Sequence, residues 1–370
     1  MRILTVVGNR PQFVKASVVS RALAELRETT TIGDVDEQIV HTGQHYDYSL
    51  SQIFFEQLDL KTPAWNLGIG SGSHAQQTGE ILKRLEAVLQ SERPDLVLVY
   101  GDTNSTLAGA LAAIKLHIQV AHVEAGLRSG NMRMAEEVNR VLTDRISALL
   151  FCPTATAAFN LAREGITSGV HITGDVMYDC LKVIQRRDRC SRALAGFGLQ
   201  PLEYAVATIH RAENTDNPIR LRAAIAALEK LVTMGLRVVF PVHPRTSRRL
   251  TESDISVRGL QIIEPVGYIE MVALTQHARL IVTDSGGLQK EAFLLDTPCV
   301  TLREETEWPE TLSDGWNVLA GCDTRRIVES CARQLEKPIR GDGSAKDLFG
   351  DGLAAEEIAR LLCGHPTADD

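Results

Sequence analysis

The sequence lacks the paired cysteines that indicate a disulfide framework or a zinc site. Its seven cysteines are an odd number, and no two of them form a CxxC pair. HExxH and clustered Cys and His residues are absent as well, so no metal is expected. A reducing cytosol fits this pattern, with most thiols serving as small core residues. The cysteines are Cys152, Cys180, Cys190, Cys299, Cys322, Cys331 and Cys363.

Long hydrophobic runs and an excess of positive charge are also missing. No apolar run approaches the roughly 20 residues that a membrane span needs. The apolar run near the N-terminus covers only Ile3 to Val7, and no small-residue cleavage site follows it. The net charge of −8 argues against general binding to nucleic acids or anionic membranes. We therefore expect a soluble cytoplasmic globular protein without nucleic-acid or membrane partners.

The common nucleotide and nucleophile motifs are absent. The turn after the first apolar run reads "GNRPQF" instead of the dinucleotide-binding motif G-x-G-x-x-G. The sequence therefore gives no support for binding of NAD or FAD. A P-loop and a G-x-S-x-G nucleophile elbow are missing too. "TDSGG" is superficially similar to the "GDSGG" of trypsin-like proteases, which are all-β proteins with disulfides. Because this chain alternates strands with helices, we dismiss that likeness and expect no cofactor.

What the sequence does contain is a repeated alternation of short apolar runs and amphipathic helical segments. Such alternation predicts parallel sheets covered by helices on both faces. The pattern occurs twice, with a charge-rich join near 176–203. A length of 370 residues also favours two domains. We predict two Rossmann-like, doubly wound α/β domains facing across a cleft, 1–176 and 177–353, with a C-terminal helix at about 354–370 on the first.

In the first half, carboxylates follow the apolar runs, where α/β folds bind ligands. Asp102 comes after "LVLVY" and Gly101, and Glu124 follows "VAHV". Glu136 begins the next helical segment, where stabilisation by the helix dipole is an alternative reason for its presence. His122, inside an apolar strand, is expected to be a satisfied core histidine. Three acids at one sheet edge favour acid–base chemistry.

In the second half, His210 with Arg211 and then His243 end two apolar runs. "LIVTDSGGLQKEA" places Ser285, Gly286 and Gly287 between a strand and a helix, which favours an anion held on helical N–H groups. For Asp284 we prefer the role of helix N-cap.

Near the N-terminus, Arg10 and Lys15 lie five residues apart around a helix start. That spacing lets both side chains point at one anion, although a solvated helix face explains the pair equally well.

A set of motifs runs in order along nearly the whole chain, from residue 1 to about 322. The motifs are "GNRPQFVKASVVSRAL", "HTGQHYD", "VYGDTNSTLAGALAA", "AHVEAGLRS", "EEVNR", "VHITGDVMYD", "IHRAEN", "PVHPR" and "LIVTDSGGLQKEA". They are specific as a set, and together they resemble the non-hydrolysing UDP-N-acetylglucosamine 2-epimerases. This resemblance implies a GT-B arrangement, a UDP-sugar as the small-molecule partner, and a homodimer.

The activity that the resemblance implies is reversible inversion at C2 of a UDP-linked 2-acetamido sugar, from UDP-GlcNAc to UDP-ManNAc. The reaction proceeds by elimination of UDP to a 2-acetamidoglucal and by its re-addition. By the family's motifs, Asp102, Glu124 and Glu136 serve proton transfer, and His210 serves the leaving diphosphate. Glu291 would accept hydrogen bonds from the ribose hydroxyls. The substrate contacts implied are Arg10, Lys15, Arg211, His243, Tyr268, Ser285, Gly286, Gly287, Glu291 and Arg303.

The chain departs from the family's pattern in "EETEWPE", residues 304–310. Trp308 stands where the best-studied members carry an arginine, with Arg303 upstream. An aromatic residue there resembles the branch that acts on UDP-2,3-diacetamido-2,3-dideoxyglucuronate. In that branch Arg133 could meet a sugar carboxylate, although surface exposure is the simpler expectation.

Regulation is a second point of departure. Gln44, Arg211 and His243 match the set that binds an allosteric UDP-N-acetylglucosamine in bacterial members. Asp47 and His74 stand where other members have different polar residues. We therefore expect activation by a second substrate molecule to be weakened or lost.

Three other functions share parts of this pattern. A GT-B glycosyltransferase would share the fold and the UDP contacts but would need only one base. A hydrolysing epimerase would release UDP and a free sugar. A two-lobed sugar-binding protein would need none of the acids for activity.

Overall fold

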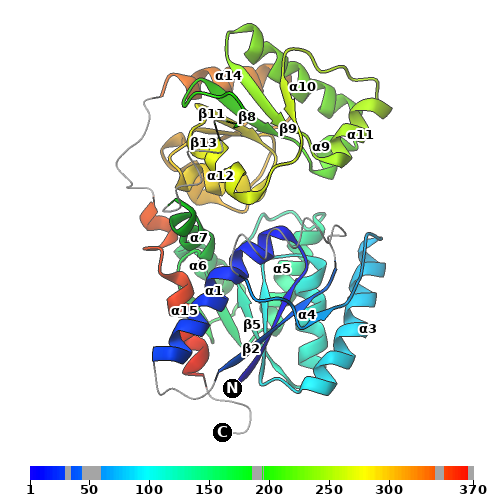
Figure 1. Cartoon of the computed structure of the whole chain (residues 1–370), viewed down its shortest axis with the longest axis vertical. Helices are drawn as coiled ribbons and strands as arrows, with labels where there is room; N and C mark the ends of the chain where they lie inside the picture. Colours follow the sequence, from blue (N-terminus) through cyan, green and yellow to red (C-terminus); the bar gives the residue numbers. More distant parts are fainter. Residues whose placement is uncertain (30–34, 44–59, 186–193, 195, 338–345, 366–370) are drawn as a thin grey trace. The chain divides into compact units, whose positions relative to one another are not determined.

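The computed structural model describes residues 1–29, 35–43, 60–185, 194, 196–337 and 346–365. It divides into two compact units. Unit 1 comprises Met1–Cys180 and Leu348–Asp370, and unit 2 comprises Leu181–Asp347. Each unit is built around its own parallel sheet with helices packed on it (Figure 1). The fold class expected from the alternating pattern is therefore confirmed.

The sheet of unit 1 has the strand order β3-β2-β1-β4-β5-β6-β7, and every described pair is parallel. β1 and β4 are buried along almost their whole length, as expected for strands covered on both faces. The strands are β1 (Arg2–Val7), β2 (Asp36–His41), β3 (Trp65–Asn66), β4 (Leu96–Tyr100), β5 (Gln119–Val123), β6 (Leu149–Cys152) and β7 (Val170–Ile172).

Helices cover this sheet on both faces. Apolar side chains of α3 and α4 form one core cluster with those of β1 and β4. α1 and α15 lie side by side, so the end of the described chain packs against its beginning (Figure 1). The helices are α1 (Arg10–Thr29), α3 (His74–Glu92), α4 (Asn104–Lys115), α5 (Ala135–Ile146), α6 (Ala155–Arg163), α7 (Val176–Gln185) and α15 (Ala354–Cys363).

The sheet of unit 2 has the order β10-β9-β8-β11-β12-β13, again parallel throughout. The alternation of strand side chains divides its core into two layers. Val238 packs with the cluster that contains α10 and α14, whereas Val239 packs with the cluster that contains α12 and α13. The strands are β8 (Tyr204–Thr208), β9 (Arg237–Pro241), β10 (Gln261–Ile263), β11 (Leu280–Thr283), β12 (Cys299–Thr301) and β13 (Asn317–Leu319).

The helices of unit 2 begin at side chains suited to that position. Asn217 caps α10, with Pro218 at the first helical position, and Asp323 caps α14. The helices are α9 (Ala212–Thr215), α10 (Pro218–Thr233), α11 (Pro244–Glu252), α12 (Tyr268–Gln276), α13 (Gly286–Leu294) and α14 (Thr324–Leu335). Two short 3₁₀ helices, η1 (Pro309–Gly315) and η2 (Lys346–Phe349), complete the described elements.

Each sheet contains a point where the chain reverses its direction of strand addition. β1 lies between β2 and β4, and β8 lies between β9 and β11. Ligands of doubly wound sheets bind beyond the carboxyl ends of the strands at such a switch point. The switch points of units 1 and 2 therefore mark where functional side chains should gather.

Candidate functional site

The switch point of unit 1 is fixed by Gln12, a buried residue in the first turn of α1. Its Oε1 accepts a hydrogen bond from the Gly8 N–H at 2.7 Å, and its Nε2 donates to the Tyr100 carbonyl, also at 2.7 Å. Because Tyr100 ends β4, the start of α1 is tied to the turn that carries Asp102. Thr103 then caps α4 with a capping box.

Glu124 occupies the turn after β5, next to the turn after β4. Its backbone has φ +73°, a left-handed conformation that a non-glycine residue adopts only under local strain. The buried carboxylate forms an ion pair with the Lys15 ammonium of α1. Gly101 is adjacent, since a Cβ placed on it would lie 3.3 Å from Glu124 Oε2. The structure thus brings together Lys15, expected to contact the nucleotide sugar, and Glu124, expected to move a proton.

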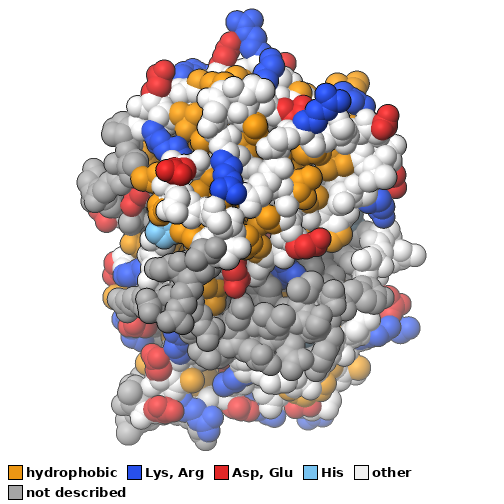
Figure 2. All heavy atoms as spheres, turned by 45° about the horizontal axis from the view of Figure 1, so that its top comes forward, with side chains coloured by type: hydrophobic (Ala, Val, Ile, Leu, Met, Phe, Trp, Pro, Cys, Tyr) orange, Lys and Arg blue, Asp and Glu red, His pale blue; other side chains and the backbone are white. Residues whose placement is uncertain are grey.

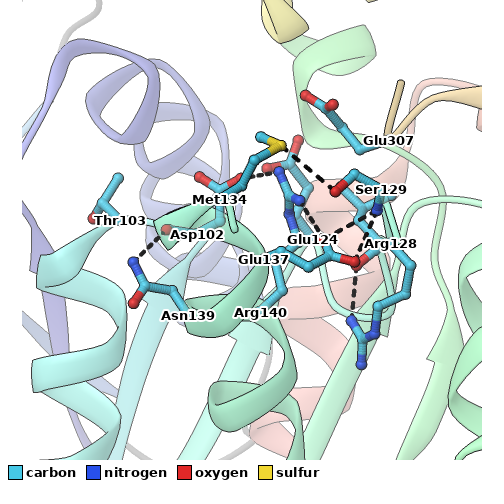
Figure 3. Close-up of polar contacts among 12 residues, drawn as sticks. Asp102, Thr103, Glu124, Arg128, Ser129, Met134, Glu137, Asn139, Arg140 and Glu307 are labelled. Carbon is cyan, nitrogen blue, oxygen red and sulfur yellow. Dashed lines mark hydrogen bonds and ion pairs between the residues drawn. The ribbon is translucent and has the colours of Figure 1, made fainter. Parts of the chain in front are cut away.

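Asp102 is held by Arg140 of α5 (Figure 3). The Arg140 Nη2 lies 2.5 Å from Asp102 Oδ2, and its Nη1 lies 2.7 Å from Glu137 Oε2. Glu137 also accepts hydrogen bonds from the N–H groups of Ser129 and Gly130. Burial raises the pKa of Glu137, but these backbone bonds and Arg140 outweigh it and leave that pKa lowered. Arg140 therefore joins the ionised Glu137 to Asp102.

Glu136 lies in the first turn of α5, one residue before Glu137, and is half-buried. The two neighbours differ in surroundings, because Glu137 is buried and bonded whereas Glu136 retains contact with solvent. From the sequence we expected Glu136 to serve proton transfer, because it matches the family's motif, and we expected no role for Glu137. The spacing of Glu137 and Arg140, three residues apart on one helix, was the available signal for that pair.

His122 is the satisfied core histidine that the sequence predicted. Its side chain is fully buried. The Nδ1 atom lies 2.7 Å from Asp144 Oδ1, and the Nε2 atom lies 2.7 Å from the Gly101 carbonyl oxygen.

The switch point of unit 2 is organised by Asp284, which is fully buried at the end of β11. Its carboxylate accepts hydrogen bonds from the backbone N–H groups of His210 and Arg211, at 3.0 Å each. The cap of α13 is instead Ser285, whose Oγ accepts from the Leu288 N–H. Our expectation that Asp284 is the N-cap was therefore wrong. The neighbouring turn after β8 presents backbone donors that this carboxylate satisfies.

His210 and His243 follow neighbouring strands, β8 and β9, and both are exposed. Their ring centroids are 6.4 Å apart. His210 Nδ1 is 3.3 Å from Asp284 Oδ1. Partial burial and the charges of Arg211 and Arg245 lower the pKa of His210, while Asp284 opposes them. His243 also caps α11 by accepting from the Arg245 N–H.

Gly286 and Gly287 form the first two positions of α13 rather than a separate loop. N–H groups in the first turn of a helix have no partner within the helix, which suits an anion. Gly286 is needed for close approach, because a Cβ there would lie 2.1 Å from Glu307 Oε1. The carboxylate of Glu307 pairs with two arginines. Its Oε2 lies 2.8 Å from Arg303 Nη1, and its Oε1 lies 3.7 Å from Arg211 Nη2.

The remaining expected site residues lie on the same elements or next to them. Glu291 is buried on α13, and Tyr268 opens α12 in a half-buried position. Trp308 is buried, with the Lys290 ammonium 3.9 Å from its ring centroid. Arg10 begins α1 and is half-buried. Arg133 is exposed, as the sequence suggested.

The expected allosteric set is only partly described. Gln44 and Asp47 lie outside the described residues, as does Cys190.

The other cysteines are free thiols in buried or half-buried positions. Among the described helices, none is long and apolar enough to cross a membrane. On the face shown in Figure 2, basic and acidic side chains of the described residues are interspersed, and no broad patch carries one sign.

The chain was compared with known families and proteins. A family model described as UDP-N-acetylglucosamine 2-epimerase matches residues 27–363, nearly the full length. The chain belongs to the UDP-N-acetylglucosamine 2-epimerase family. The family that the sequence motifs indicated is confirmed by this match.

Relatives within the family are similar over their whole length. A "UDP-N-acetylglucosamine 2-epimerase homolog" of Methanococcus maripaludis is 51% identical, covering 98% of this chain and 99% of the relative. The UDP-2,3-diacetamido-2,3-dideoxy-D-glucuronate 2-epimerase of Pseudomonas aeruginosa is 48% identical with the same coverage. The solved UDP-GlcNAc 2-epimerase of Methanocaldococcus jannaschii, in complex with UDP-GlcNAc and UDP, is 42% identical. It matches with a TM-score of 0.89 over 98% of this chain and 99% of that one.

Proposed function

We propose that this protein catalyses reversible epimerisation at C2 of a UDP-linked 2-acetamido sugar, interconverting UDP-GlcNAc and UDP-ManNAc. Membership of the family carries the proposal. It is supported by the solved family member with UDP-GlcNAc and UDP bound, which covers 98% of this chain. The carboxylates gathered at the switch point of unit 1 supply the acid–base groups that such a reaction needs.

The proposed mechanism is an elimination followed by an addition. A carboxylate takes the proton from C2, the C1–O bond breaks, and its electron pair leaves with the diphosphate of UDP. A C1=C2 double bond then remains in a 2-acetamidoglucal. UDP re-adds at C1 while a proton is delivered to the opposite face of C2. Atoms and charges balance without a redox partner.

Within unit 1, we assign proton transfer or its support to Asp102, Glu124 and Glu136. Asp102 and Glu124 occupy neighbouring turns, after the paired strands β4 and β5. Each is paired with a cation, Arg140 and Lys15 respectively, so that each carboxylate is held in a fixed position from which it can act on a proton. Arg10 and Lys15 are assigned to the substrate.

Within unit 2, we assign the leaving diphosphate to His210 and to the N-terminus of α13. A lowered pKa keeps His210 neutral near pH 7, so one ring nitrogen can donate a hydrogen bond while the other accepts. The helix N-terminus supplies N–H groups and a favourable dipole. We assign Glu291 to the ribose hydroxyls. The other proposed substrate contacts are Arg211, His243, Tyr268, Ser285, Gly286, Gly287 and Arg303.

A second candidate substrate is UDP-2,3-diacetamido-2,3-dideoxyglucuronate. Two observations favour it: the aromatic Trp308 in place of the family's arginine, and the 48% identity to the P. aeruginosa enzyme named for that sugar. The buried contact between Lys290 and Trp308 places the aromatic ring within the packed part of unit 2.

The deciding experiment is NMR of the product mixture in deuterated water, run separately with each UDP-sugar. We expect inversion at C2, deuterium at C2 of the product, and no net release of UDP. Turnover only after an acceptor is added would indicate a glycosyltransferase. Net UDP release would indicate a hydrolysing epimerase. As the matched variant, Asp102→Asn should lower the exchange rate about 10²- to 10⁴-fold; full activity would refute its role.

We also propose a cytoplasmic homodimer with weakened or absent activation by a second substrate molecule. The free thiols fit a reducing compartment. Light scattering coupled to size exclusion measures the assembly. Hyperbolic initial rates against substrate concentration are expected. Strong sigmoidality relieved by trace UDP-N-acetylglucosamine would contradict the regulatory part.

A further inference from the structure

Both ring nitrogens of His122 face oxygen atoms that accept hydrogen bonds. The Gly101 carbonyl oxygen, 2.7 Å from Nε2, carries no proton, so Nε2 must donate. Asp144 Oδ1 lies 2.7 Å from Nδ1. The protonation of the ring is therefore decided by the state of Asp144.

Asp144 is surrounded by donors. Its Oδ2 accepts from the Gly126 N–H at 3.1 Å and from Arg128 Nη1 at 2.7 Å. Arg128 also pairs with Glu164 at 2.7 Å, which fixes the guanidinium in place. Burial raises the pKa of Asp144, but the hydrogen bonds and charges of His122 and Arg128 outweigh it and lower that pKa. Because Oδ2 of Asp144 accepts from a backbone N–H and from the Arg128 guanidinium, Asp144 is held as a carboxylate, and Nδ1 of His122 donates to its Oδ1.

The two bonds of His122 connect two functional turns. Gly101 precedes Asp102, so the Gly101 carbonyl belongs to the peptide group that leads into that carboxylate. The Gly101 N–H is also fixed, donating to the Val123 carbonyl at 2.9 Å. On the other side, Asp144 holds the Gly126 N–H, two residues after Glu124. With φ +64° at Gly101 and +80° at Gly126, both turns use a left-handed backbone conformation that glycine adopts without strain.

We propose that His122 is a positioning residue for proton transfer. With a proton on each ring nitrogen, it bridges Asp144 to the Gly101 carbonyl and so fixes the peptide that aims the Asp102 carboxylate at the substrate. The inference rests on the proposed epimerase function. A misplacement of about 1 Å in a reacting group can lower a rate about 100-fold, so loss of this bridge acts on turnover rather than on binding.

Two substitutions test the two hydrogen bonds of His122 one at a time. The amide of His122→Asn can occupy the place of Nδ1 and donate to Asp144, but it leaves the Gly101 carbonyl without its donor. The amide of His122→Gln can occupy the place of Nε2 and donate to Gly101, but it abandons Asp144. Both remove the imidazole from the same buried position, so each serves as the packing control for the other.

We expect His122→Asn to lower kcat about 100-fold with KM for the UDP-sugar unchanged, and to lower C2 deuterium exchange in parallel. His122→Gln should keep kcat within about 3-fold of the wild type. Equal losses in the two variants at equal thermal stability would overturn the proposal, as would a loss expressed in KM alone. If wild-type protein exchanges no deuterium at C2, the proposed function fails instead.

The protonation state of the His122 ring can be measured directly by NMR. In protein labelled with ¹⁵N-histidine, the His122 ring is expected to give the two similar ¹⁵N signals of a doubly protonated ring, assigned by their loss in His122→Gln. A widely separated pair, which marks one unprotonated nitrogen, would overturn the bridge. This measurement needs no substrate and is independent of the enzymatic assignment.

Discussion

Arg140 balances the charge of two carboxylates of unit 1, Asp102 and Glu137. Its side chain is 2% exposed, and it binds both the buried Glu137 and the partly exposed Asp102. A buried ion pair contributes little net stability while it is intact, but removing one partner leaves a charge without compensation. Arg140 therefore ties a group proposed to react to one that only supports the fold.

Replacing Arg140 by leucine should reduce the free energy of unfolding by about 3–5 kcal/mol, because Glu137 would stay buried without its cation. Arg145 provides a matched control on the same helix, since it is exposed. Arg145→Ala should change the free energy by no more than about 0.5 kcal/mol. Hydrogen exchange of unit 1 peptides, followed by mass spectrometry, measures both. Similar protection in the two variants would contradict this account.

At this scale the sequence predicts some site residues and misses others for a physical reason. Asp102 and Glu124 could be predicted because both lie in the turns at the ends of apolar strands. The contacts of Asp144 with Arg128 and of Arg140 with Asp102 could not, because these partners are 16 and 38 residues apart along the chain and meet only in the folded unit. Asp284 was misassigned for the same reason: its donors come from a turn 73 to 74 residues earlier.

At the scale of elements, the N-terminus of α13 contains two glycines in different surroundings. Gly286 is buried beneath the carboxylate of Glu307, which is itself held by Arg303 and Arg211. Gly287 is exposed, and a Cβ added there would lie 3.9 Å from its nearest neighbour, Ser285 Oγ. Neither glycine has positive φ among the described residues, so backbone freedom does not explain them.

Gly286→Ala should lower the free energy of unfolding by about 1–3 kcal/mol, because the new methyl group displaces Glu307 from its cations. Gly287→Ala, one residue later in the same helix, should be neutral or stabilising by up to about 1 kcal/mol. Urea unfolding of the two variants tests the difference. The account fails if the order is reversed or if both substitutions are tolerated equally.

Most strands could be predicted at this scale because a strand buried on both faces is a continuous apolar run. The apolar runs of the alternating pattern overlap the described strands β1, β2 and β4–β13. β3 was not expected, because a strand of two residues, Trp65–Asn66, carries no periodicity. α13 begins two residues before the expected Leu288, since Ser285 rather than Asp284 supplies its cap.

At the scale of the whole molecule, the chain leaves unit 1, forms unit 2, and returns to unit 1. The returning helix, α15, buries Ala354, Ala355, Ile358, Ala359 and Leu362. Its first turn is held by Asp179 of α7, whose Oδ2 accepts the Ala355 N–H at 2.6 Å. α15 lies against α1, so the two ends of the described chain stabilise each other.

Ile358→Ala should reduce the stability of unit 1 by about 2–5 kcal/mol, because it opens a cavity where the side chain is fully buried. Arg360, on the exposed side of the same helix, pairs with Glu357 at the surface, so Arg360→Ala should cost less than about 1 kcal/mol. Hydrogen exchange should show lost protection in residues 1–180 and unchanged protection in 181–347. Equal losses in both units would show that they unfold as one.

This return of the chain sets an order of events on the ribosome. Domains fold as units while the chain is being made, and all of Leu181–Asp347 has been synthesised before α15 is. The unit that begins first is therefore completed last. Until Ala354–Cys363 is released, the apolar surface of α1 that this helix covers stays open to chaperones and to other nascent chains.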